Sequence, residues 1–390
     1  MVLVLKLIHI QLQTSTIYGT KQKTCKNGTI ATYNKATNEV SLSNIHMPDY
    51  CTMNFRYTIY GKLLADNTTI KTRTDFSSVF TETNTETLYK VTESIANSPA
   101  KDVYYFASNA TNNWVKFGNY YWRIIRTNAD GSVRLLYAGT SPDTTEGYIG
   151  KSAFNSTYEN PKYVGYMYGV DDSTLEGIRT NTKDSTIKTY IDNWYSTNLS
   201  SYSKYISTEA VYCNDREKGS GTYSANSSTF YFAAYTRLYT NKTPTYNCTN
   251  IKDSFSGSNS EAKLTYPIGL MTADEITYAG GYKATSLTSP YAWYYLNSAG
   301  GSITGSAWWW SLSPMCWSGS GSGVWDVWGV WGVWGVWGVD GSNYPGYLSG
   351  YYVSRSYGVR PVISLKTCTL WASGNGASET PYEIVENGGC

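Results

Sequence analysis

Apolar and polar positions alternate with period two in several short stretches of the chain, and the first two lie near its start. Residues 29–34 (TIATYN) and 39–45 (EVSLSNI) follow this pattern, which is typical of strands with one buried face. Asn27 and Gly28 precede both stretches and are a strong signal for a tight hairpin turn. The pattern predicts a small β-rich module over residues 1–65, for which an immunoglobulin-like arrangement is one candidate.

The segment that follows this module changes in character. Residues 66–100 turn polar and are rich in Thr, Ser, Asn and Asp, which is typical of a linker. Within it, residues 85–97 (TETLYKVTESIAN) predict a short helix.

The first twelve residues, MVLVLKLIHIQL, are apolar but far shorter than the ~20 residues that a membrane span needs. They lack the basic region and small-residue cleavage site of a signal peptide. They are expected to be either a first strand or the start of a fragment whose export signal is missing, and the fragment is favoured. No membrane span is predicted.

A second unit begins near residue 101. Residues 121–126 and 133–137 are strand-like and flank the sequence NADG, in which Asp130 and Gly131 suit a tight hairpin turn. An amphipathic helix is predicted over about residues 185–199, with Leu199 slightly out of phase. Its apolar positions at helical spacing are Ile187, Tyr190, Ile191 and Trp194.

A second helix is predicted by the sequence LMTADEITYAGG. Thr272 can cap its start while Glu275 reaches back to complete a capping box, and two glycines at 280 and 281 end it. The adjacent carboxylates of Asp274 and Glu275 therefore suit the helix dipole better than acid–base chemistry. Strands, two helices and then short strands with glycine-rich loops predict the α+β class, because helices and strands do not alternate.

Composition adds a preference for contact surfaces. The chain has 38 Tyr, 14 Trp and 35 Gly among 390 residues, and Tyr with Ser, Gly and Asn is typical of adaptable binding surfaces. An extracellular β-rich protein accumulates similar residues, so both interpretations stay open. The net charge of +2 comes without a basic stripe, and no nucleic-acid partner is predicted.

Seven cysteines occur without a C-x-x-C motif or a histidine at metal-ligand spacing, which argues against zinc. Disulfides are the expected use, and they imply export to the cell surface or the extracellular space. The expected pairs are Cys25 with Cys51 and Cys213 with Cys248. The odd count leaves at least one thiol free or intermolecular among the others.

Six blocks of the second unit occur in a recognisable order. They are NNWVKFGNYYWRIIRTNADGSVRLLY, IDNWYSTNL, YCNDR, YPIGLMTADEITYAGG, WWWSLSP and GVRPVISLK. In these blocks the chain resembles bacterial surface proteins whose final domain is C-type-lectin-like, a fold shared with variable proteins of diversity-generating retroelements and with formylglycine-generating enzymes. The resemblance implies a C-type-lectin-like domain at residues 101–370, followed by a tail at 371–390.

Neither catalysis nor a cofactor is expected. Both histidines, His9 and His46, lie outside the second unit, so that unit cannot hold a histidine-based triad. A formylglycine-type site needs a close cysteine pair or a metal that cysteines hold, and Cys316 alone does not supply one. Only Asp326 and Asp340 could offer calcium its oxygen ligands in the last part of the chain, so no metal is predicted.

An aromatic segment near the end of the chain is the predicted ligand-binding site. Its Val-Trp-Gly repeat puts successive tryptophans on alternating faces of a strand, so some rings would be exposed on either a strand or a coil. At least one of the tryptophans at 308–310 is expected in the core, and Arg360 is expected to be structural. The predicted site residues are Trp317, Trp325, Asp326, Trp328, Trp331, Trp334, Trp337, Asp340, Asn343, Tyr344, Tyr347 and Tyr351.

The favoured hypothesis is an exported, non-enzymatic binding protein that recognises a protein or glycan on another cell, a phage or a host surface. Residues 317–357 would form the recognition face, which the resemblance suggests is hypervariable. The rival hypothesis is a structural surface protein that self-associates through the tryptophan-rich segment, and an enzyme is the weakest alternative. Slippage of the coding repeat could explain how VWGVWGVWGVWG arose.

Overall fold

The computed structural model describes residues 17–34, 39–46, 49, 51–82, 86–96, 98–142, 147–226, 229–283, 285, 308–317, 335–340, 347–387 and 390. Over these residues the chain forms 26 strands and four α-helices, the longest of 13 residues. The largest sheets have ten and eight strands. The predicted α+β class with a C-type-lectin-like domain is therefore wrong. The chain is mostly strand, as its many Tyr, Thr and Val residues favour.

The ten-stranded sheet runs in the order β18, β24, β10, β9, β7, β6, β5, and β8 connects β9 to β26 and β25. The bounds are β5 (Thr69–Lys71), β6 (Thr87–Glu93), β7 (Lys101–Tyr105), β8 (Trp114–Phe117), β9 (Tyr120–Thr127), β10 (Val133–Tyr137), β18 (Gly269–Leu270), β24 (Pro361–Leu365), β25 (Trp371–Ser373) and β26 (Tyr382–Ile384). The predicted hairpin at Asp130-Gly131 is confirmed, because β9 and β10 pair and Gly131 has a φ of 82°.

The eight-stranded sheet runs in the order β11, β23, β20, β21, β22, β19, with β16 and β15 joined to β20. The bounds are β11 (Lys151–Ser152), β15 (Lys218–Gly221), β16 (Phe230–Phe232), β19 (Tyr282–Lys283), β20 (Trp309–Trp317), β21 (Gly335–Asp340), β22 (Tyr347–Tyr352) and β23 (Tyr357–Gly358). Two small pairs complete this part of the chain: β12 (Met167–Tyr168) with β13 (Lys183–Asp184), and β14 (Tyr212–Cys213) with β17 (Ser254–Phe255).

Both predicted helices of the second unit are confirmed. Helix α2 spans Thr186–Asn198, and helix α4 spans Ala273–Ala279 with the capping box of Thr272 and Glu275. The remaining helical segments are α1 (Ile59–Asp66), α3 (Ala233–Tyr235), the 3-10 turns η1 (Pro161–Val164), η2 (Gly177–Arg179), η3 (Ser200–Tyr205) and η5 (Ser260–Ala262), and the π-helical η4 (Thr236–Asn241).

The segments predicted as a linker and a tail belong to the ten-stranded sheet. The short helix predicted within residues 85–97 is wrong, because Thr87–Glu93 form β6 and pair with β7 from Tyr89 to Glu93. Thr and Val favour a strand there, and buried Leu88 packs in the core. At the other end, β26 pairs in parallel with β8, and Tyr382 is buried.

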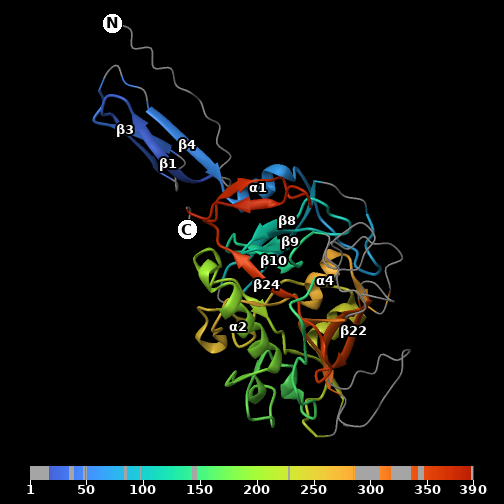
Figure 1. Ribbon diagram of the computed structural model, residues 1–390. Helices are drawn as coiled ribbons and strands as arrows, with labels where there is room; N and C mark the ends of the chain where they lie inside the picture. Colours follow the sequence, from blue (N-terminus) through green and yellow to red (C-terminus); the bar gives the residue numbers. More distant parts are fainter. Residues whose placement is uncertain are drawn as a thin grey trace.

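The N-terminal module projects from one end of the molecule (Figure 1). It contains β1 (Ile17–Cys25) paired with β4 (Cys51–Tyr57), and β2 (Ile30–Asn34) paired with β3 (Glu39–Ser43). Asn27 and Gly28 make a turn, but the strands on either side of it pair elsewhere, so the hairpin predicted there is wrong. Cys25 is disulfide-bonded and lies opposite Cys51 in the register, which suits the predicted pair.

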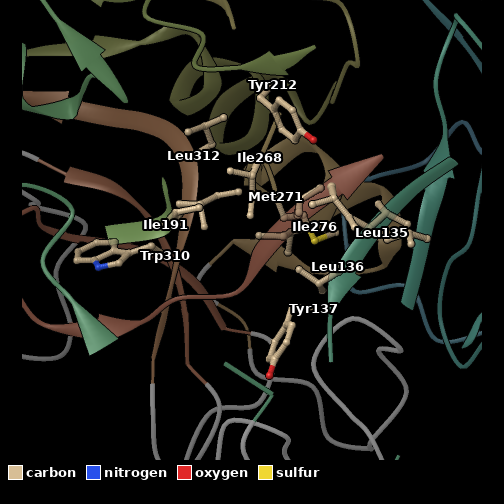
Figure 2. Close-up of a cluster of buried hydrophobic side chains, with 14 of the residues drawn as sticks. Leu135, Leu136, Tyr137, Ile191, Tyr212, Ile268, Met271, Ile276, Trp310 and Leu312 are labelled. Carbon is tan, nitrogen blue, oxygen red and sulfur yellow. The ribbon is translucent and has the colours of Figure 1, made fainter. Parts of the chain in front are cut away.

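A core of apolar side chains fills the space between the large sheets and the two predicted helices (Figure 2). Leu135 and Leu136 enter it from β10, Ile191 from α2, Ile276 from α4 and Trp310 from β20, and all five are fully buried. Burying one aliphatic side chain of this size stabilises a fold by about 1.5–3 kcal/mol. The core therefore fixes β20, the strand from which the candidate site is built.

Candidate functional site

The structure places only part of the predicted binding segment. The predicted site residues Trp325, Asp326, Trp328, Trp331, Trp334, Asn343 and Tyr344 lie outside the described residues. The backbones of Trp337 and Asp340 belong to β21 and that of Tyr347 to β22, while their side chains lie outside the description. Trp317 and Tyr351 are the predicted site residues whose side chains the structure describes.

Trp317 does not present a binding face. It ends β20 with 2% of its surface exposed, because every residue of this strand is buried. Trp309 and Trp310 are fully buried in the same strand, and the Trp310 Nε1 donates to the Ser152 carbonyl at 2.8 Å. The expectation that at least one tryptophan of 308–310 packs in the core is confirmed.

Arg360 is a structural residue, as expected. Its buried guanidinium donates through Nη2 and Nε to the Tyr137 carbonyl, at 3.1 and 3.3 Å, and lies 5.0 Å from the ring centre of Trp309. It thus joins β10 of one large sheet to β20 of the other.

Three half-buried aromatic side chains pack together where β20 begins, namely Trp308, Tyr351 of β22 and Tyr357 of β23, and we call them the aromatic surface. Trp308 lies edge to face with Tyr351, with ring centres 3.9 Å apart. Tyr357 lies 5.2 Å from Tyr351 and 5.8 Å from Trp308. Tyr352 contacts Tyr158, with ring centres 5.8 Å apart, but it alternates with Tyr351 along β22, so this pair is not part of the aromatic surface. The rings of the aromatic surface combine a large apolar area with polar tips, which suits them to contact both protein and sugar.

A close approach of β22 to β20 holds the aromatic surface in place. A Cβ on Gly350 would clash with the Met315 side chain, so a larger residue here would require the flexible end of Met315 to move. Leu348 shares that face of β22 and is 1% exposed. Tyr351 falls on the alternate face, where it meets Trp308.

A second aromatic group lies beside β20, because its first member, Tyr231, belongs to the paired strand β16. The rings of Tyr231, Tyr235 and Tyr239 stack in series, with centres 4.1 and 4.9 Å apart and planes within 23° of parallel. The Lys283 Nζ lies 3.2 Å from the ring centre of Tyr239 and donates to its carbonyl at 2.7 Å. Burial raises the pKa of Tyr235, so its hydroxyl stays protonated at neutral pH. We call these three tyrosines the tyrosine stack.

A buried network of ion pairs lies under α4, and the sequence analysis missed it. Glu275 Oε1 lies 2.8 Å from Arg126 Nε and 2.8 Å from Arg134 Nε, and Arg126 also contacts Glu93 at 2.8 Å. Burial opposes the charge on Glu275, but Arg134 and Arg126 lower the pKa of its carboxyl below the usual value overall. We call these four residues the ionic core.

Arginines within strand-like segments of the sequence are a signal for the ionic core. The strand segments YYWRIIRT and VRLLY carry arginines among apolar residues, and a buried arginine needs a carboxylate partner. The position of Asp274 and Glu275 in a first helical turn indicates only a role in balancing the helix dipole. In the structure, Asp274 also forms an ion pair with Arg237 at 2.7 Å.

The cysteines divide into bonded and thiol forms. The predicted pair Cys213–Cys248 is confirmed, and Cys368 is bonded to Cys390. Cys316 keeps its thiol inside β20, where burial raises its pKa to about 12. A thiol with this pKa is protonated at neutral pH and is a poor nucleophile.

Two kinds of feature are absent from the described part of the chain. There, no cluster of three or more His, Cys, Asp or Glu side chains is arranged to hold a metal ion. No described helix has both the length and the apolar character to cross a bilayer.

Comparison of the chain with protein-family models, with curated proteins and with solved structures finds no match. The function therefore has to be argued from the site itself.

Proposed function

We propose that this chain is an exported, non-enzymatic binding protein that recognises a protein or glycan ligand on another cell, a phage or a host surface. The aromatic surface of Trp308, Tyr351 and Tyr357 supplies the contact area. Strands β21 and β22, which belong to the predicted recognition face at residues 317–357, extend it, whereas Trp317 is buried.

The observation that carries this proposal is the partial burial of three packed aromatic side chains, which come from the residue before β20 and from β22 and β23. Trp308 and Tyr351 contact each other, and neither is withdrawn into the core as Trp309 and Trp310 are. Tyr and Trp dominate binding energy at interfaces because they bury much area with little loss of side-chain entropy. A surface held by β20 and β22 needs little ordering when a ligand binds.

Export is supported by the disulfides. Cys213–Cys248 and Cys368–Cys390 close separate loops, and Cys25 is bonded as well. Structural disulfides form and persist in oxidising surroundings such as the periplasm or the cell exterior.

A matched pair of double variants tests the site. The test pair is Tyr351→Ala with Tyr357→Ala, whose half-buried rings lie edge to face at 5.2 Å. The control pair is Tyr163→Ala with Tyr168→Ala, which is also half-buried and edge to face at 5.4 Å. The full chain and both variants are applied to arrays of glycans and of immobilised peptides.

The test pair is expected to weaken binding to the captured ligand by at least about tenfold, as loss of a hot spot does. The control pair should stay within about twofold of the wild type. An array that captures nothing, or equal losses in both pairs, would overturn the proposal. Light scattering on the same samples separates recognition from self-association, since a wild-type polymer that the test pair dissolves would favour a structural role.

A narrower part of the proposal is diversification of the site in the manner of retroelement variable proteins. Sequencing many copies of this locus from one population tests it. Differences confined to residues 317–357 would support it, and uniform variation along the chain would reject it.

A further inference from the structure

A cleft of about 470 Å³, lined by both polar and apolar groups, lies apart from the aromatic surface. Four segments form its walls: the β6–β7 connection, the turn at 128–130, residues 209–211, and the loop at 251–260. Its volume falls in the range of sites that hold small molecules.

The walls of this cleft are held in place by covalent and hydrogen bonds. The Cys213–Cys248 disulfide anchors one side, where Cys248 N–H donates to Ser94 and Ala96 N–H donates to Cys248, both at 2.9 Å. Across the cleft, Gly257 N–H donates to the Thr208 carbonyl at 2.8 Å. Most of the lining therefore needs no ordering before a ligand enters.

The floor of the cleft carries no unbalanced charge. Glu93 is buried there, and its two carboxylate oxygens accept from the Arg126 guanidinium at 2.8 Å and from Ala129 N–H at 2.7 Å. A ligand that reaches the floor meets a neutral ion pair, so no net charge on the ligand is required.

The rim offers both donors and acceptors. Exposed Asp130 and Glu209 contribute carboxylates, exposed Lys101 contributes an ammonium group, and Ser258 and Ser260 contribute hydroxyls. Beside them, Ile251 is 39% exposed and gives an apolar patch.

We infer that this cleft binds a short neutral carbohydrate of one or two sugar units. Each sugar hydroxyl both donates and accepts, so it is matched by carboxylates together with ammonium and hydroxyl groups. The C–H face of a sugar ring is apolar, and Ile251 provides a surface for it. An anionic ligand would face Asp130 and Glu209, and a purely apolar one would leave the rim groups without partners.

Saturation-transfer NMR on the full chain tests this inference with cellobiose, maltose and chitobiose as probes. The wild type should bind at least one of them with a dissociation constant of about 0.1–1 mM. Ser258→Trp should abolish the signal by filling the cleft, and Glu209→Gln with Lys101→Met should weaken binding about tenfold. All three side chains are exposed, so these variants are expected to fold, and a thermal melt checks that they do.

Matched controls use exposed residues that do not line the cleft. Glu261→Gln with Lys263→Met removes the same two charges and should leave binding unchanged. The inference is overturned if no disaccharide binds the wild type, or if Ser258→Trp binds as well as the wild type does.

Testing the same disaccharides on variants of the aromatic surface distinguishes this inference from the proposed function. Tyr351→Ala with Tyr357→Ala should leave disaccharide binding intact. If that pair abolishes it while Ser258→Trp does not, the sugar binds the aromatic surface, and the cleft has no such role. Loss of array binding alone would concern the aromatic surface and not the cleft.

Discussion

The ionic core and the aromatic surface stabilise neighbouring parts of the molecule in different ways. In the ionic core, each charge of Arg126, Arg134 and Glu275 has a partner at 2.8 Å and is nearly inaccessible to solvent. Around β20, stability comes from rings, which are fully buried at Trp309 and Trp310 and half-buried at Trp308 and Tyr351.

The two regions therefore differ in which of their groups solvent can reach. The charges of the ionic core are matched by one another, and these ion pairs fix α4 against β9 and β10. Aromatic packing continues from the core to the surface without a sharp end, because rings pack against any apolar neighbour.

Glu275→Gln should break the ionic core and produce the largest loss of stability. Two guanidinium groups would then stay buried with one carboxylate fewer, and loss of one partner of a buried ion pair costs about 3–5 kcal/mol. Chemical denaturation measures the change in the free energy of unfolding. Exposed Glu261→Gln is the control and should change it by less than about 0.5 kcal/mol.

The pH dependence of the free energy of unfolding, measured for the wild type and for Glu275→Gln, gives a second test. Arg134 and Arg126 lower the pKa of Glu275 in the folded chain, so its contribution is fully present above its ordinary pKa of 4.5. The contribution is lost as the pH falls through the lowered folded value. The difference in free energy of unfolding between the wild type and Glu275→Gln should therefore become smaller in acid. A difference that grows in acid would contradict the role given to Glu275.

The double variant Cys213→Ser with Cys248→Ser comes next in size. The bond closes a separation of 35 residues, and disulfides over loops of this length stabilise proteins by about 2–4 kcal/mol. The comparison variant Cys368→Ser with Cys390→Ser opens a separation of 22 residues and should cost somewhat less. Array binding through the aromatic surface should survive both, since neither bond contacts Trp308 or Tyr351 in the described structure.

The elements best predicted from sequence were those with local signals. The helix at 186–198 follows from apolar spacing, the helix at 273–279 from its capping box, and the hairpin at 130–131 from its turn residues. These signals depend on neighbours within a few residues, so no knowledge of tertiary contacts is needed.

Long-range pairing could not be predicted in this way. The ten-stranded sheet takes in Tyr382–Ile384 because this segment pairs with β8, which lies far away in the sequence, and no residue near Tyr382 indicates this pairing. The same holds for Glu275, whose arginine partners lie about 140 residues or more away. Burial of Trp317 likewise follows from its strand neighbours and not from its own segment.

Thr272→Ala tests one local signal and should have a smaller effect. The Thr272 hydroxyl accepts from Glu275 N–H at 3.1 Å, and loss of such a cap costs about 1 kcal/mol. Thr272→Ser keeps the hydroxyl and should restore most of the stability in the same denaturation experiment. A loss as large as that of Glu275→Gln would mean that the cap also orients the ionic core.

The smallest effect is expected on the aromatic side, from Lys283→Met. The Lys283 ammonium group faces the ring of Tyr239, and a cation over an aromatic ring contributes about 0.5–1 kcal/mol at exposed sites. Methionine keeps the length of the side chain but removes both the charge and the hydrogen bond to the Tyr239 carbonyl, whereas Lys283→Arg keeps the charge and a donor. Exposed Lys183→Met serves as the control for loss of a lysine elsewhere.

Denaturation of these three variants separates a charge–ring contact from an ion pair. Lys283→Met should be destabilised by no more than about 1 kcal/mol, while Lys283→Arg and Lys183→Met stay close to wild type. A loss of several kcal/mol would place Lys283 with the buried, fully matched charges of the ionic core. A small loss of stability would instead mean that the Lys283 charge only supplements the packing of the tyrosine stack. The stacked rings would then be the main source of stability in this region.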